Sequence, residues 1–136
     1  ERPQAEADAV AAYGLHLGMA FQMIDDALDY GSSDADIGKN VGDDLAEGKP
    51  TLPLIRAMAV CKDEQRQLLR SAIENGDGHQ LTAVIRIIES TDAIAYTAGL
   101  AREEAEKAKS ALRTLAPSAY RSALEALADF SVQRSI

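Results

Sequence analysis

The stretch from Gly14 to Tyr30, GLHLGMAFQMIDDALDY, decides the fold of this chain. It contains no proline and few β-branched residues, so it predicts an α-helix. At about 100° per residue, one narrow arc of that helix collects the polar side chains, whereas the opposite arc is apolar. The members of this polar stripe are Gln22, Asp25, Asp26 and Asp29, with Gly14 and Gly18 in line before them. Such a helix has too little polar surface to be an ordinary exposed helix.

Three carboxylates on one stripe are unfavourable on their own. Carboxylates about 6 Å apart repel by roughly 2–3 kcal/mol at an effective dielectric constant near 20, and like charges four residues apart weaken a helix. A divalent cation removes this repulsion, and Mg²⁺ typically binds one or two carboxylates together with waters and a substrate phosphate. Asp25, Asp26 and Asp29 are therefore predicted metal ligands, and the two glycines leave room for a ligand or a closely packed helix. The alternative interpretation is a solvated acidic face.

The composition is that of one helical domain. The chain has 136 residues, of which 46% are hydrophobic and only 4% aromatic, and this favours helix packing over sheet. Cys61 is the one cysteine, so no internal disulfide can form and a reduced, cytoplasmic setting is expected. The longest apolar run, residues 9–24, is shorter than the roughly 20 residues of a membrane span. The chain begins at Glu1, and we expect it to be part of a longer protein.

The net charge of −8 is concentrated in the first third of the chain. Residues 1–49 contain eleven acidic and three basic side chains, whereas residues 50–136 contain eleven of each. This distribution argues against nucleic-acid binding, which needs a basic surface. It favours the capture of a cation.

The remaining sequence predicts further helices and no strands. Residues 1–12 continue the first helix toward its N-terminus, and residues 31–50 form a long glycine-rich connection, expected to be mobile without ligand. In this connection Lys39 and Lys49 each follow a glycine, from where a lysine can reach a phosphate. Helices are expected at residues 51–61 with Thr51 as cap, at residues 63–75 with Asp63 as cap, and at residues 80–89, 92–115 and 119–134.

Three other features have structural interpretations. His16 lies away from the carboxylate stripe and is interpreted as a packed histidine. Cys61 is interpreted as a small apolar filler, since no histidine is near it in sequence. The charged run from Arg102 to Lys109 is interpreted as a solvated face.

Two motifs resemble those of a known family. Gly18-x-x-Phe21-Gln22-x-x-Asp25-Asp26-x-x-Asp29 resembles the second aspartate-rich motif of the trans-polyprenyl diphosphate synthases. Residues 38–53, GKNVGDDLAEGKPTLP, resemble the signature that follows this motif in the family. The amino-acid sequence of the two motifs is most similar to that of bacterial long-chain synthases of the octaprenyl type.

The resemblance implies a fold and a reaction. The fold is the all-α isoprenoid synthase helical bundle, with residues 1–136 as its C-terminal portion: a metal-binding helix at 1–30, a glycine-rich loop at 31–50 and a helical bundle at 51–136. The reaction is the Mg²⁺-dependent condensation of an allylic diphosphate with isopentenyl diphosphate, in a homodimer. The implied residues are Asp25, Asp26 and Asp29 for metal binding, Gln22, Lys39 and Lys49 for the substrate diphosphate, and Asp25, Asp26 and Lys39 for catalysis.

The chain lacks two features that the family has. These are the first aspartate-rich motif and the basic pocket for isopentenyl diphosphate, so the isolated chain is expected to be inactive and to self-associate through an uncovered apolar face. Two other functions stay open. One is a class I terpene-cyclising relative with the same metal site, against which residues 38–53 argue. The other is a helical interaction module without chemistry. Product chain length does not follow from these residues.

Overall fold

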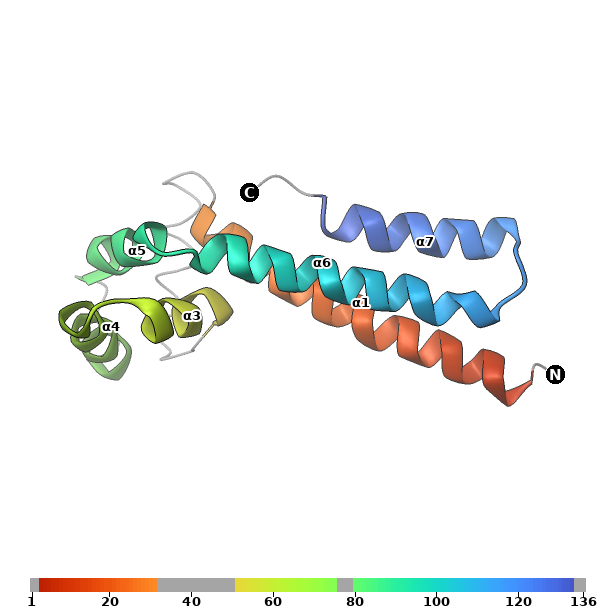
Figure 1. The fold of residues 1–136 in the computed structure, drawn as a ribbon, viewed down its shortest axis with the longest axis horizontal. Coiled ribbons are helices and arrows are strands. Elements are labelled where there is room, and N and C mark those ends of the chain that lie inside the picture. Colours follow the sequence, from red (N-terminus) through yellow and green to blue (C-terminus); the bar gives the residue numbers. More distant parts are fainter. Residues whose placement is uncertain (1–2, 32–50, 76–79, 134–136) are drawn as a thin grey trace. The chain divides into compact units, whose positions relative to one another are not determined.

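In a computed structural model of the chain, all regular elements among residues 3–31, 51–75 and 80–133, the part that the structure describes, are helices (Figure 1). The order is α1 (Gln4–Gly31), α3 (Leu52–Val60), α4 (Asp63–Asn75), α5 (Leu81–Ser90), α6 (Ala93–Ala111), the 3₁₀ helix η2 (Leu112–Thr114) and α7 (Ala119–Ser131). The all-α prediction is confirmed. None of the described helices is long and apolar enough to cross a membrane. The predicted loop lies, after Gly31, outside the described residues.

The helix starts partly differ from the predicted caps. Thr51 takes the N-cap position of α3, but its hydroxyl makes no capping bond and donates instead to the Tyr30 hydroxyl at 3.2 Å. Asp63 is the first residue of α4 rather than its cap, because the backbone N–H of Arg66 already bonds to the carbonyl of Lys62. The predicted N-cap position of Thr51 is therefore confirmed, although its side chain makes no capping bond, whereas the capping role predicted for Asp63 is wrong. Helix ends depend on tertiary partners that a local motif does not contain.

The chain divides into two compact units, which are described separately: a first unit of Glu1–Ile24 with Ala98–Ser135 and a second unit of Asp25–Thr97. Helices α1 and α6 each contribute to both. In the second unit α3, α4 and α5 pack against one another. Its core contains the fully buried side chains of Leu54, Leu69, Val84 and Ile88, together with buried Tyr30 and Cys61. The interpretation of Cys61 as an apolar filler is confirmed.

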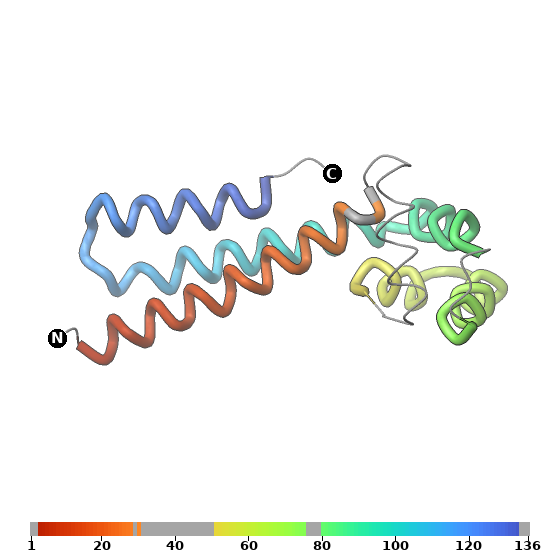
Figure 2. The backbone as a smooth tube through the Cα atoms, turned by 180° about the vertical axis from the view of Figure 1, so that it is seen from behind, coloured from red at the N-terminus to blue at the C-terminus, as the bar shows by residue number. Residues whose placement is uncertain are grey.

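The first unit packs α1, α6 and α7 together. Figures 1 and 2 show α6 alongside both of the other helices from opposite sides. The buried residues that join the three helices and η2 are Ala9, Tyr13, Ala108, Leu112, Leu115 and Ala128. The Tyr13 hydroxyl donates to the Leu124 carbonyl at 2.8 Å, and burial is the main cause that raises the pKa of Tyr13. Lys109 pairs with Asp129 at 2.7 Å, which links α6 to α7.

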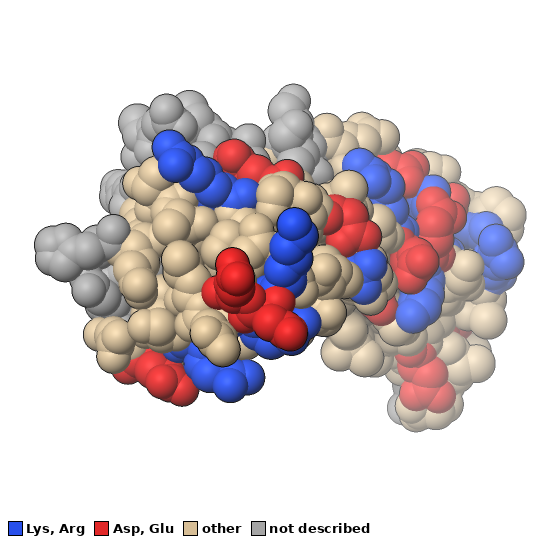
Figure 3. All heavy atoms as spheres, turned by 60° about the vertical axis from the view of Figure 1, so that its left-hand side comes forward, with Lys and Arg blue, Asp and Glu red and all other residues tan. Residues whose placement is uncertain are grey.

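Charged side chains of opposite sign lie next to one another on the face drawn in Figure 3. In the second unit Arg56 donates two hydrogen bonds to Asp92, at 3.0 and 2.8 Å, and stacks over the Tyr96 ring at 4.1 Å. Arg66 pairs with Asp63 and also donates to the carbonyls of Met58 and Cys61. The last contacts satisfy carbonyl groups at the end of α3, which a helix cannot satisfy itself.

Candidate metal-binding site

The second half of α1 has its predicted polar stripe at the surface. Gln22 and Asp25 are exposed and Asp26 is half-buried, whereas Ile24 and Ala27 are completely buried. The buried positions recur every three or four residues, as expected for a helix with one face in a core. The predicted polarity of this helix is confirmed. The assigned roles of the polar residues stay predictions.

The surface beside this stripe is apolar and open. Leu15 is 64% exposed and Met19 is 39% exposed. A Cβ atom placed on Gly14 or Gly18 would meet no described atom within 4 Å. The room that was expected at the two glycines is therefore present, and no described helix packs closely against them. This face of α1 can accept a ligand or another helix.

The described side chains fit part of a magnesium site. Asp25 and Asp26 provide carboxylate oxygens, the hard donors that Mg²⁺ prefers. Asp29 lies on the same helix, but its side chain is outside the described part. Among the residues that the structure describes, no group of three or more His, Cys, Asp or Glu side chains could hold a metal. The donor set fits the ion, with further ligands still needed.

The predicted phosphate-binding lysines cannot be placed beside this stripe. Lys39 and Lys49 lie in residues 32–50, outside the described part of the chain. The described residues thus bring together Gln22, Asp25 and Asp26 on one helix.

The sequence interpretation missed one polar contact at the centre of the first unit. Glu104 is only 7% exposed, and its Oε2 lies 2.6 Å from Nδ1 of His16. Its other oxygen accepts from Lys107 at 3.2 Å. The hydrogen bond from His16 is the main cause that lowers the pKa of Glu104, against burial, which raises it; Lys107 also lowers it. The interpretation of Arg102–Lys109 as a wholly solvated face is wrong at Glu104.

A local signal for this contact exists, but it is weak. Glu104 lies three residues after Ala101 and four before Ala108, and both of these alanines are completely buried. A carboxylate at a position that the helical repeat assigns to the buried face therefore indicates a buried partner. His16, a half-buried residue rather than a fully packed one, provides that partner from 88 residues away.

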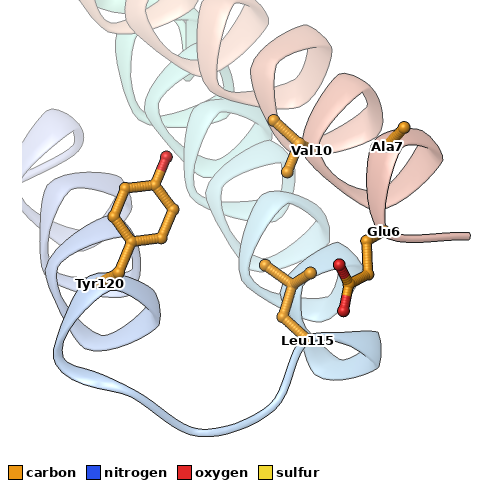
Figure 4. A pocket seen from close by; sticks show the side chains of 5 residues that line it. All are labelled: Glu6, Ala7, Val10, Leu115 and Tyr120. Atoms are coloured by element: carbon orange, nitrogen blue, oxygen red, sulfur yellow. The ribbon is translucent and has the colours of Figure 1, made fainter. Parts of the chain in front are cut away.

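A hollow of about 370 Å³ lies between the start of α1 and the start of α7 (Figure 4). Its lining residues are Glu6, Ala7, Val10, Leu115 and Tyr120. Glu6 and the Tyr120 hydroxyl are its polar groups, and no basic side chain lines it. It is therefore unsuited to a diphosphate.

The chain belongs to the polyprenyl synthetase family, since the family model described as "Polyprenyl synthetase" matches residues 1–91. It is 50% identical over 123 residues to octaprenyl diphosphate synthase of Escherichia coli (strain K12), with 90% of this chain and 38% of that protein covered. It is 52% identical over 120 residues to the all-trans-nonaprenyl-diphosphate synthase (geranyl-diphosphate specific) of Rhodobacter capsulatus, covering 88% and 37%. The chain thus spans about two fifths of the length of these relatives.

Solved structures agree with the family. The structure of polyprenyl synthase from Caulobacter crescentus CB15 complexed with calcium and isoprenyl diphosphate matches with a TM-score of 0.86 and 41% identity. The match covers 98% of this chain and 41% of that chain. The decaprenyl diphosphate synthase of Rhodobacter capsulatus matches with a TM-score of 0.80 and 32% identity, covering 96% and 40%. The predicted isoprenoid synthase fold is confirmed.

Proposed function

We propose that this chain is the C-terminal part of a polyprenyl diphosphate synthase, which condenses an allylic diphosphate with isopentenyl diphosphate to a longer polyprenyl diphosphate. The carrying observation is the stripe of exposed Gln22 and Asp25 and half-buried Asp26 on α1 in a chain of this family. The Caulobacter relative, whose structure contains calcium and isoprenyl diphosphate, supports a divalent cation and a diphosphate as ligands. Mg²⁺ is the proposed physiological ion.

The residues of α1 would hold the ion and orient the diphosphate. Asp25, Asp26 and Asp29 would bind Mg²⁺, and the ion, when bound, supplies positive charge that favours departure of the diphosphate. Gln22 lies about one turn before Asp25 and Asp26 on the same face of the helix. Its amide would donate a hydrogen bond to a diphosphate oxygen. Lys39 and Lys49 would add charge stabilisation to the leaving anion.

The proposal also covers the activity of the isolated chain and the assembly and location of the complete synthase. Because the chain spans about two fifths of its relatives, we expect it to be inactive alone. The proposed form of the complete synthase is a cytoplasmic homodimer. Uncovered apolar residues favour self-association of the chain as well; among them are Leu15, Tyr120 and Phe130, each more than 60% exposed. Sedimentation of the isolated chain at increasing concentration tests this. A purely monomeric species would contradict it.

Binding measurements on the chain test the metal role without turnover. Mg²⁺ alone should bind weakly, since it sheds its waters reluctantly and α1 offers few ligands. Diphosphate alone should also bind weakly because the acidic stripe repels it. Together each should strengthen the other, and this coupling is reciprocal. Calorimetric titrations of each ligand in the presence and absence of the other measure the coupling.

The matched variants are Asp25→Asn and, as control, Asp8→Asn in the first turns of the same helix, where Asp8 is exposed. Asp25→Asn should abolish the coupling and, in the complete synthase, lower turnover by about 10² or more, whereas stability should change little or rise slightly. Asp8→Asn should change neither. Equal coupling in both variants would favour the alternative of a helical module without chemistry.

A further inference from the structure

The last turn of α1 enters the core of the second unit through one aromatic side chain. Tyr30 is only 3% exposed and belongs to the buried cluster of that unit. The other buried members of this cluster lie between Leu54 and Ala93, so among its described residues Tyr30 is the one from α1. Tyr30 therefore joins the end of α1 to this core.

The hydroxyl of Tyr30 has a directed contact in this core. Thr51 Oγ1 donates a hydrogen bond to Tyr30 Oη at 3.2 Å, and both residues are buried. Thr51 is at the N-cap position of α3, where its side chain makes no capping bond and where Pro53 in the first turn offers no N–H. The hydroxyl thus serves a tertiary contact between α1 and α3. Apolar contact has no preferred direction, whereas a hydrogen bond restricts both distance and angle.

This contact lies close to the carboxylates of the polar stripe. Asp26 precedes Tyr30 by four residues, so the two lie one turn apart on the same side of α1. Asp25, Asp26, Tyr30 and Thr51 all belong to the second unit. A displacement of Tyr30 against α3 is therefore carried to both carboxylates over little more than one helical turn. Displacing groups that position a reactant by about 1 Å can lower a rate by about 10².

We propose that Tyr30 and Thr51 are positioning residues that hold Asp25 and Asp26 in place relative to the start of α3. The consequence for metal and diphosphate binding rests on the proposed function. Thr51 follows the proposed diphosphate ligand Lys49 by two residues in the sequence. The two hydroxyl groups are assigned to placement of the helix and not to binding of the ion or the diphosphate.

The test measures binding of inorganic diphosphate to the complete synthase in the presence of Mg²⁺, by calorimetry. Tyr30→Phe and Thr51→Val each remove one hydroxyl and keep a side chain of similar shape. Each should raise the Kd about fivefold or more and lower turnover about tenfold, because the carboxylates lose their fixed place. Thr51→Ser keeps the donor and should leave the Kd within about twofold of the parent.

The matched control is Tyr13→Phe in the first unit. Tyr13 is also a buried tyrosine, and its hydroxyl donates to the Leu124 carbonyl at 2.8 Å. Both tyrosine variants should lower the melting temperature, because each leaves a buried polar group without its hydrogen bond. Only Tyr30→Phe should raise the Kd, and this separates positioning from a general loss of stability.

The double variant Tyr30→Phe with Thr51→Val separates the same two effects within one site. It removes both hydroxyl groups, so neither is left buried without the other. Its melting temperature should therefore be higher than the sum of the two single losses predicts. Its Kd should nevertheless stay as high as in the single variants, because the directed contact is absent.

A Kd within about twofold of the parent in both single variants would overturn the proposal, and an equal rise in Tyr13→Phe would do the same. If one single variant does not fold, the other decides. Failure of the proposed function gives a different result, because Asp25→Asn then leaves the Kd unchanged, and this inference fails with it. A raised Kd in Asp25→Asn without one in Tyr30→Phe and Thr51→Val overturns this inference alone.

Discussion

The two units of this chain bury different kinds of side chain. The second unit contains most of the largest fully buried residues, among them Leu54, Leu69, Val84 and Ile88. The first unit buries many alanines on its helices, together with the larger side chains of Tyr13, Ile24 and Leu112. Branched aliphatic side chains specify packing through their shape. Small alanine side chains specify less by shape, and polar contacts between the helices in the described part of the first unit include Tyr13 with Leu124, His16 with Glu104, and Lys109 with Asp129.

The largest effect is expected from a cavity in the second unit. Ile88→Ala removes three carbon atoms at a fully buried position and should lower the free energy of unfolding by about 2–5 kcal/mol. Ile55, 48% exposed on α3, is the matched control. Ile55→Ala should change stability by about 0.5 kcal/mol or less. Denaturant unfolding measures both, and equal losses would contradict a core specified by shape in this unit.

In the first unit, enlarging a small buried side chain should lower the stability. Ala101→Leu inserts three carbon atoms at a position with no exposed surface and should destabilise by about 1–3 kcal/mol, since close helix packing leaves no space. Ala126→Leu on the exposed side of α7 is the control and should stay within about 0.5 kcal/mol. If Ala101→Leu were neutral in denaturant unfolding, the alanine interface would be loosely packed, and the contrast between the units would fail.

A smaller effect on stability is expected at the start of α7 in the first unit. Ser118 accepts a hydrogen bond from the Arg121 backbone N–H at 3.1 Å, so Ser118→Ala should cost about 1 kcal/mol. Ser118→Asp preserves the acceptor and should be nearly neutral. Thermal unfolding compares the two variants. A loss for Ser118→Asp as large as that for Ser118→Ala would show that the hydrogen bond is not the cause.

The smallest effect concerns acid stability. The pKa of Glu104 is lowered below its ordinary value of 4.5, first by the hydrogen bond from His16 and then by Lys107, against burial. A lowered pKa in the folded state stabilises the protein above the unfolded value, and this stability is lost as the pH falls toward the folded value. Glu104→Gln should therefore flatten the loss of stability below pH 4.5.

Stability measured by denaturant as a function of pH tests this, with Glu103→Gln as control. The exposed Glu103 should leave the acid slope unchanged. Equal slopes for both variants would remove Glu104 from the causes of acid sensitivity in the first unit.

Local patterns predicted the helices well. The helix around Gly14–Tyr30 is present within α1, and the start and end of α4 agree with the predicted range of residues 63–75. These features depend on residues within a few positions of one another, which propensity and periodicity describe. Thr51 takes the predicted N-cap position, but its hydroxyl donates to Tyr30 and makes no capping bond. The predicted capping role of Asp63 was wrong because α4 already includes Asp63, with the Arg66 N–H bonded to the Lys62 carbonyl.

Some features of the described side chains follow from the sequence alone, and others follow only from tertiary packing. The sequence by itself determined that Gln22, Asp25 and Asp26 share a polar stripe opposite buried residues, because helical geometry relates side chains three and four residues apart. Only the tertiary structure decided that Glu104 is buried and that His16 is its partner, because the two residues are 88 positions apart. No local period relates residues on different helices. Their contact exists only once α1 and α6 are packed together.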